Sequence, residues 1–263
     1  MRHKFSNLFR IMAVLSALVV GLVLSSSGTA LAITNGQPDN DNHPYVCIIV
    51  IFDEEGEFVT CGSGVLISPT VVLTAGHVTT EGPYAFVSFA PEGIEYGSLE
   101  GYTFGTTHTH PEYQLEYKPG RPGYLTHDVG VVQLVEPVIM TEYGTLPDEG
   151  IIATLKMKTD LDLVGYGYND IDRPSGNLIF YGARYYAPSE LIASKHKQSD
   201  EFIKITANPG QGKGGPYFGD SGGPVLLGGT DVILGLVSYG AGVGYAARVD
   251  TEDVLSWIDG WLP

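Results

Sequence analysis

Basic residues are scarce in this sequence of 263 residues. It holds 14 Lys and Arg against 30 Asp and Glu, which gives a formal net charge of −16 at pH 7. Such a charge keeps a protein soluble and repels nucleic acid and anionic membrane surfaces. We therefore expect no nucleic-acid partner and no attraction to a lipid surface.

A hydrophobic run long enough to span a bilayer is also missing. The N-terminal apolar run, Ile11–Leu24, covers fourteen residues, whereas a membrane-spanning helix needs about 20. Three basic residues precede this run, and the string "ALA" at 30–32 follows it. That order predicts a secretory signal peptide over residues 1–32 rather than a transmembrane anchor. The remaining domain, 33–263, would then be secreted and free of the membrane.

Cysteine is limited to Cys47 and Cys61, so at most one disulfide can form within the chain. In an exported protein, two cysteines favour one bridge. Both lie in β-rich runs on either side of the turn-like "DEEG", and they face each other if the turn centres near Glu54. We predict a Cys47–Cys61 disulfide, with two free thiols as the alternative.

Complete cofactor and metal motifs are absent as well. The stretch "GQGKGG" at 210–215 lacks the G-x-x-x-x-G-K-[ST] spacing of a phosphate-binding loop, which excludes nucleotide binding there. His108 and His110 have a spacing that suggests a metal pair, but no carboxylate or cysteine cluster completes the site. We therefore expect no cofactor and no metal.

Short strand-like runs fill most of the chain after residue 33. Segments such as "GVLISPTVVLTAG" and "DVGVVQLVEP" alternate with turns rich in Gly, Pro, Asn and Asp. Regularly spaced short strands predict a sandwich or a barrel. Over residues 251–262, helical spacing predicts instead a C-terminal amphipathic helix capped by Thr251. Its apolar face consists of Val254, Trp257, Ile258 and Trp261.

Three segments carry residues suited to nucleophilic catalysis. The string "GDSGGP" contains Ser221, "LTAGH" ends in His77, and "THDVGVVQL" places Asp128 at the start of a strand. A serine hydroxyl is a weak nucleophile and needs a base within hydrogen-bond reach. Histidine suits that task because its unperturbed pKa of about 6.5 lies near working pH. A carboxylate on the other ring nitrogen fixes the tautomer and stabilises the imidazolium.

These segments, with "ITNG" at 33–36 and the late "SYG…ARV", resemble the chymotrypsin/trypsin family of serine proteases. The resemblance covers nearly all of residues 33–262. It implies an all-β fold of two six-stranded antiparallel Greek-key barrels, divided near residues 140–160, with a C-terminal α-helix. It also implies a monomeric serine endopeptidase that cleaves protein or peptide substrates through an acyl-enzyme.

The resemblance assigns the catalytic roles residue by residue. The triad is His77, Asp128 and Ser221, and the backbone N–H groups of Gly219 and Ser221 form the oxyanion hole. A new N-terminus at Ile33 would pair its ammonium with Asp220 and order the oxyanion hole. The signal-peptidase cut falls immediately before Ile33, so one cleavage would complete export and activate the enzyme.

The resemblance also locates the pocket for the P1 side chain. It assigns to substrate binding Gly215, Phe218, Ser238, Tyr239 and Gly240. Gly215 stands at the base of this pocket, and no acidic residue lies between Thr206 and Gly219. A cationic P1 side chain would lack a buried partner. We therefore expect an apolar or aromatic P1 residue rather than Arg or Lys.

The sequence departs from the animal-type pattern of the family. Val78 follows His77 where many relatives have a cysteine, and the disulfides usual near the pocket are missing, as in bacterial secreted members. The family commonly has an "HP-x-Y" stretch, so His110 is assigned a structural role. Two other functions stay open: a catalytically inactive binding protein on this fold, and an esterase using the same triad. The triad order, with Ser221 last, differs from that of α/β-hydrolases.

Overall fold

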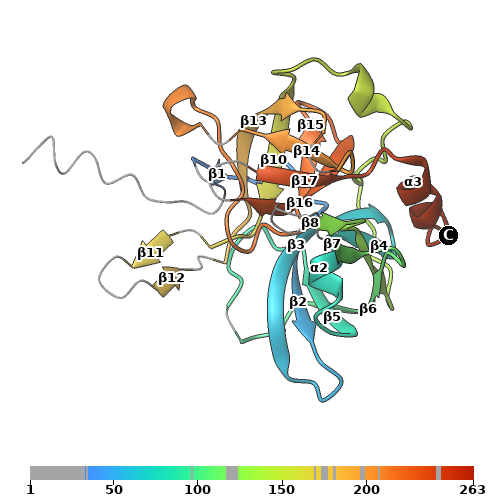
Figure 1. Ribbon diagram of the computed structural model, residues 1–263. Coiled ribbons are helices and arrows are strands. Elements are labelled where there is room, and N and C mark those ends of the chain that lie inside the picture. The colour runs from blue at the N-terminus through green and yellow to red at the C-terminus, as the bar shows by residue number, and fades with distance from the viewer. Residues whose placement is uncertain are drawn as a thin grey trace, which may run out of the picture. The chain divides into compact units, whose positions relative to one another are not determined.

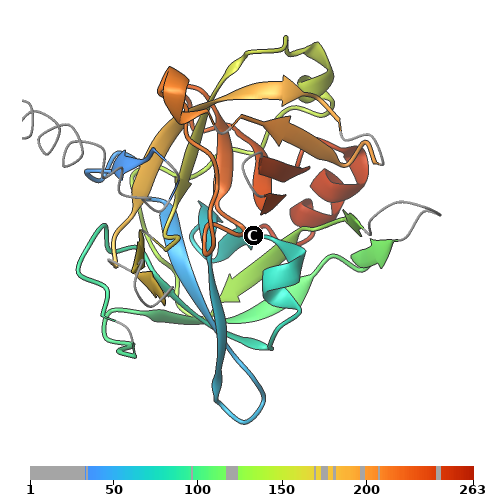
Figure 2. The ribbon, with the colours of Figure 1, turned by 60° about the vertical axis from the view of Figure 1, so that its left-hand side comes forward.

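The structure is a computed structural model that describes residues 33, 35–95, 97–116, 124–168, 170–172, 177–179, 182–195, 199–206, 208–240 and 244–263. Strands predominate (Figures 1 and 2). They are β1 (Gln37–Pro38), β2 (Val46–Phe52), β3 (Phe58–Ser68), β4 (Val71–Thr74), β5 (Tyr84–Ser88), β6 (Thr103–Thr109), β7 (Gln114–Glu116), β8 (Tyr124–Thr126), β9 (Gly130–Leu134), β10 (Asp160–Gly165), β11 (Asp170–Asp172), β12 (Asn177–Ile179), β13 (Tyr185–Ala193), β14 (Phe202–Ile205), β15 (Pro224–Leu227), β16 (Ile233–Gly240) and β17 (Gly244–Arg248). The described helices are α2 (Gly76–Thr79), α3 (Glu252–Asp259) and the 3₁₀ turns η1 (Ile151–Thr154) and η2 (Pro209–Gln211).

The first half of the described chain forms a closed antiparallel barrel in the order β2, β3, β4, β9, β6 and β5. Its strands are rich in Val, Ile and Leu, which pack well on a pleated surface. On β2, Cys47, Ile49 and Ile51 are fully buried, whereas Val50 and Phe52 on the other face are only partly buried. This period of two therefore directs the odd-numbered residues of β2 into the barrel.

The second half forms a second antiparallel barrel in the order β13, β10, β15, β16, β17 and β14, closed by pairing of β13 with β14. The short strand β1 joins its edge, with Gln37 opposite Tyr186 on β13. Ile33 is buried in the apolar cluster of this barrel. The predicted all-β fold, with two six-stranded antiparallel barrels and a C-terminal helix, is confirmed.

The C-terminal helix α3 is shorter than the predicted range of 251–262. Thr251 precedes it with an extended backbone, but the Thr251 side chain makes no capping hydrogen bond to the backbone. Val254 and Ile258 are buried as predicted. None of the described helices has the length and apolar character needed to cross a bilayer.

Two tryptophans of the C-terminal segment pack against the first barrel. Trp261 stacks on His108 of β6, with 4.1 Å between ring centroids, and Trp257 meets His110 edge-on at 5.0 Å. The segment that follows β17 of the second barrel thus contacts β6 of the first barrel and the residue just after it. Both histidines have an aromatic neighbour on this segment.

The predicted Cys47–Cys61 disulfide is wrong, because the register of the β2–β3 hairpin separates the two residues. Cys47 lies opposite Gly64, and Cys61 lies opposite Val50. The two cysteines are thus three residues out of register, which is about 10 Å along a strand. An odd offset also places them on opposite faces of the sheet. Both are free thiols.

The physical reason for this register lies at the turn. The Asp53 N–H donates to the Glu57 carbonyl, and the pairing shifts between Ile51 and Phe52. The turn therefore centres nearer Glu55 than Glu54. An irregularity of this kind moves every following pair along the hairpin.

Candidate active site

His77 and Asp128 are joined through two groups of the histidine. His77 lies in the short helix α2, directly after β4, and Asp128 lies between β8 and β9. The backbone N–H of His77 donates to Asp128 Oδ1 at 2.7 Å. Its ring Nδ1 lies 2.9 Å from Asp128 Oδ2. One carboxylate thus fixes both the helix that carries the histidine and the orientation of its ring.

Asp128 is fully buried, and Ser238 supplies a further partner. The Ser238 hydroxyl on β16 donates to Asp128 Oδ2. A buried carboxylate needs such donors because burial without them strongly disfavours its charged form. The resemblance assigned Ser238 to the substrate pocket. Its hydroxyl also contacts the carboxylate assigned to the triad, and the sequence did not signal this contact between the two barrels.

The pKa of His77 is raised above its ordinary value. Burial acts to lower this pKa, but the hydrogen bond and charge of Asp128, together with the charge of Glu81, outweigh it. The side chain of His77 is 27% exposed, whereas that of Asp128 is 0% exposed. The ring can therefore meet a substrate while its partner stays out of water. The neighbouring carboxylate stabilises the protonated imidazolium form of His77 relative to the neutral ring.

Two glycines with left-handed backbone hold the loop that carries Ser221. Gly219 has φ +89° and Gly222 has φ +80°. A Cβ on Gly222 would come within 2.0 Å of Thr74 Oγ1 and 2.5 Å of the Ser63 carbonyl. Only glycine permits this backbone and this approach together. The contact sets the serine loop against the end of β4, from which α2 and His77 follow.

A backbone hydrogen bond holds Ser221 next to β3. The Ser63 N–H donates to the Ser221 carbonyl at 2.8 Å. The Ser221 hydroxyl makes no hydrogen bond with another described residue, His77 included. The chain thus brings the three predicted residues together and forms the histidine–aspartate contact, but not the serine–histidine hydrogen bond. Such bonds often tighten only when substrate is bound.

Asp220, next to the nucleophile, is buried without a cation among the described residues. Its carboxylate accepts the N–H groups of Gly167 and Tyr217, at 2.9 and 2.8 Å. Burial raises the pKa of Asp220 to about 7, although these two hydrogen bonds act to lower it. Ile33, its predicted partner, is also buried. In the full-length chain the Ile33 nitrogen is a peptide amide, so the ammonium that such a pair needs does not yet exist.

The predicted P1 residues lie on two segments of the second barrel. Gly215 is buried, whereas the Phe218 side chain is 67% exposed. Ser238, Tyr239 and Gly240 lie on β16. Tyr239 stacks on Tyr245 of β17 with 4.9 Å between ring centroids. The two segments assigned to P1 hold aromatic and glycine residues, and the 208–219 stretch contains no carboxylate.

His127, which the sequence interpretation left without a role, directly precedes Asp128 in the chain. It has an unusual φ of +47° for a residue other than glycine. Its backbone N–H donates to Glu201 Oε2 at 2.6 Å, and its Nε2 lies 2.7 Å from Asp253 Oδ2 on α3. Its ring stacks on His110 at 4.7 Å. These contacts hold a strained backbone one residue before the carboxylate assigned to the triad.

Comparisons with known proteins cover most of the chain. The family model described as Trypsin matches residues 33–258. Duodenase-1 of Bos taurus is 27% identical over 253 residues, which cover 93% of this chain and 94% of the relative. A collagenase of Hypoderma lineatum is 26% identical over 238 residues, covering 83% and 81%.

Solved structures show the same fold. A structure titled HL collagenase has a TM-score of 0.63 at 19% identity, covering 88% of this chain and 96% of the other. Human heparin binding protein has a TM-score of 0.58 at 18% identity, covering 86% and 94%. One neighbour is thus named for an activity and another for binding, so the fold alone does not decide between them.

Proposed function

Because the chain belongs to the trypsin family of serine endopeptidases, we propose that it cleaves peptide bonds with Ser221 as nucleophile and His77 as general base. The observation that carries this proposal is the double contact of His77 with the buried Asp128. The serine loop lies against the strand end from which His77 follows. Base, orienting carboxylate and nucleophile therefore occupy one site, as acyl transfer requires.

The reaction proceeds in two balanced steps. Ser221 Oγ attacks the peptide carbonyl while His77 accepts the hydroxyl proton, and the N–H groups of Gly219 and Ser221 stabilise the oxyanion. The carbon–nitrogen bond breaks as His77 passes this proton to the leaving amine, which leaves an acyl-enzyme. Water then attacks the ester with His77 as base again. Breakage of the carbon–oxygen bond returns the proton to Ser221.

The same proposal covers specificity and export. The residues around Gly215 include no carboxylate that could pair with a P1 cation, which favours an apolar or aromatic P1 residue. A peptide library ranks the P1 side chains directly, and a ranking led by Arg or Lys would contradict this preference. N-terminal sequencing of the exported protein tests the cleavage before Ile33, and a start at another residue would contradict it.

One comparison separates this function from its alternatives. The purified protein and its Ser221→Ala variant are incubated with a fluorophosphonate probe and, separately, with casein. We expect labelling and casein cleavage by the wild type, with cleavage reduced by about 10⁶-fold in the variant. An unlabelled wild type would favour the inactive binding protein. Labelling and ester hydrolysis without proteolysis would favour the esterase.

A further inference from the structure

Ser63 is a fully buried serine of β3 to which the proposed reaction gives no part. Its hydroxyl donates to the Gly219 carbonyl at 3.0 Å and accepts the Tyr166 N–H at 2.9 Å. These partners lie 156 and 103 residues further along the chain. One buried hydroxyl therefore joins a strand of the first barrel to the segment after β10 and to the nucleophile loop.

The backbone of Ser63 contacts two further parts of the candidate site. Its N–H donates to the Ser221 carbonyl at 2.8 Å. Its carbonyl accepts the hydroxyl of Thr74, the last residue of β4, at 2.8 Å. Because α2 and His77 follow β4, Ser63 lies between the nucleophile loop and the strand that leads to the proposed base.

The hydroxyl of Ser63 is closely surrounded by backbone. A Cβ on Gly165 would lie 3.2 Å from Ser63 Oγ, and a Cβ on Gly223 would lie 3.2 Å from Ser63 Cβ. The missing side chains of these glycines let two segments of the second barrel approach the serine. Removing the hydroxyl would leave the buried Tyr166 N–H without its acceptor, which is unfavourable.

The carbonyl that Ser63 holds belongs to the residue whose N–H is assigned to the oxyanion hole. On the other side of Gly219, the Tyr168 N–H donates to the Phe218 carbonyl at 2.7 Å. Across a trans peptide bond the N–H and C=O point in opposite directions, so this contact directs the Gly219 N–H away from Tyr168. Each of the two peptide planes that flank Gly219 is therefore fixed by one hydrogen bond.

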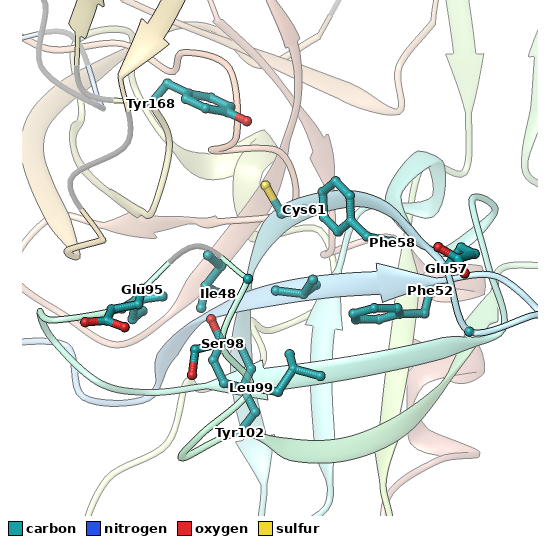
Figure 3. A pocket seen from close by; sticks show the side chains of 14 residues that line it. Ile48, Phe52, Glu57, Phe58, Cys61, Glu95, Ser98, Leu99, Tyr102 and Tyr168 are labelled. Atoms are coloured by element: carbon teal, nitrogen blue, oxygen red, sulfur yellow. The ribbon is translucent and has the colours of Figure 1, made fainter.

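Both of these hydrogen bonds depend on the same face of β3. Cys61 and Ser63 are two residues apart on the strand and therefore share a face. Tyr168 hydrogen-bonds the Cys61 thiol, and Figure 3 shows its side chain directed toward that thiol. The residue that holds the Phe218 carbonyl is thus attached to β3 beside Ser63, which holds the next carbonyl directly.

We propose that Ser63 is a positioning residue for the oxyanion hole: its hydroxyl fixes the orientation of Gly219 before a substrate arrives. Ser63 acts through the backbone of Gly219 and does not touch the substrate. Donors that are already oriented stabilise an oxyanion without reorganisation during the reaction. Loss of the hydroxyl should therefore lower kcat and leave KM nearly unchanged. This inference rests on the proposed endopeptidase function.

The first test compares Ser63→Ala with Ser189→Ala. Ser189 is also fully buried, its hydroxyl donates to the Thr206 carbonyl at 2.9 Å, and it is assigned to neither the triad nor the P1 pocket. For a peptide substrate, we expect Ser63→Ala to lower kcat about tenfold or more, with KM changed by less than about twofold. Ser189→Ala should retain the wild-type kcat. Urea unfolding confirms that both variants are folded.

A pair of substrates separates the oxyanion hole from general damage to the fold. An ester and its thionoester differ only in the oxygen or sulfur of the scissile carbonyl group, and sulfur is a weak hydrogen-bond acceptor. We expect Ser63→Ala to lower kcat/KM about tenfold or more for the ester and much less for the thionoester. Equal losses for the two substrates would overturn the proposal.

Amide hydrogen exchange tests the same role without catalysis. In Ser63→Ala, we expect the Tyr168 N–H to exchange about tenfold faster or more than in the wild type, because the loop that carries its acceptor is less fixed. The rate should be unchanged in Ser189→Ala. Unchanged exchange of the Tyr168 N–H in Ser63→Ala would overturn the proposal. Faster exchange in that variant, with a wild type that hydrolyses no ester, would support the positioning of Gly219 and contradict the endopeptidase function.

Discussion

The carboxylate of Asp128 accepts the backbone N–H of His77, the ring of the same histidine and the hydroxyl of Ser238. These donors come from both barrels. Each reaches a side chain that is fully buried. The charge of Asp128 thereby raises the pKa of His77 against the opposing effect of burial. Position and protonation of the base therefore depend on the same group.

Replacing Asp128 by Asn tests this dependence. We expect Asp128→Asn to lower kcat by about 10⁴-fold, because an amide favours the wrong histidine tautomer. Catalysis needs neutral His77, so activity falls as pH drops through the His77 pKa. The variant loses the raising effect of the carboxylate, so the acidic limb of its kcat/KM profile should move to lower pH. An acidic limb that stays in place would contradict the assignment of His77.

His127 offers a second test at the residue scale. Its φ of +47° suits Asn far better than a β-branched residue. We expect His127→Val to lower the free energy of unfolding by about 1–2 kcal/mol and to reduce kcat more than it raises KM. His127→Asn also removes the ring, but asparagine tolerates this positive φ. The Asn variant should therefore retain more activity than the Val variant. Urea unfolding and steady-state kinetics measure both effects. Equal kcat values in the two variants would contradict a role for the backbone.

At the scale of single elements, the β2–β3 hairpin makes a prediction about its thiols. Cys47 faces the barrel core, and Cys61 lies on the opposite, outward face of the sheet. We expect Ellman titration of the native protein to detect one thiol, Cys61, which reacts slowly because burial raises its pKa. Denaturant should expose the second. A reductant should leave Tm unchanged. A protein without free thiols, or a Tm lowered by reductant, would contradict the register.

The hairpin also shows why elements were easier to predict than their alignment. Short β-branched runs and the family resemblance predicted the barrels, and helical spacing predicted α3. To predict whether the two cysteines face each other, the position of the turn centre had to be known to within one residue. The turn between Asp53 and Glu57 sets most of the offset, and the shift between Ile51 and Phe52 adds to it. This shift arises from pairing across the sheet, which no local pattern in "DEEG" reveals.

The same distinction applies to the candidate site. His77, Asp128 and Ser221 each lie in a short recognisable string, so the sequence could predict them. Glu201 and Asp253 contact His127 from 74 and 126 residues away, and neither lies in a recognisable motif. Their positions depend on how the second barrel and α3 pack against the first. Residues that support a catalytic group through tertiary contacts are therefore hard to predict from one sequence.

At the scale of the whole molecule, removal of residues 1–32 would change the electrostatics around Asp220, a buried residue far along the sequence. Before cleavage, Asp220 has no described cationic partner, and its pKa is about 7 against an ordinary value of 3.8. After cleavage, the Ile33 ammonium would stabilise the ionised carboxylate. The pair would lower the pKa of Asp220 and raise that of the amino group. Export and activation would then be linked through one ion pair.

This linkage predicts a pH dependence of stability that cleavage removes. In the full-length chain, the folded state holds a proton on Asp220 that the unfolded state has lost between about pH 4 and 7. Its free energy of unfolding should therefore fall as pH rises through that window. Asp220→Asn should remove this fall. The protein that begins at Ile33 should lack it too. Its activity should fall at alkaline pH, as pH passes the pKa of the α-amino group, which the pair raises above its ordinary value of about 7.7–8.0. Urea unfolding across pH measures both forms. A cleaved protein whose stability falls over pH 4–7 as steeply as that of the full-length chain would show that Ile33 does not pair with Asp220.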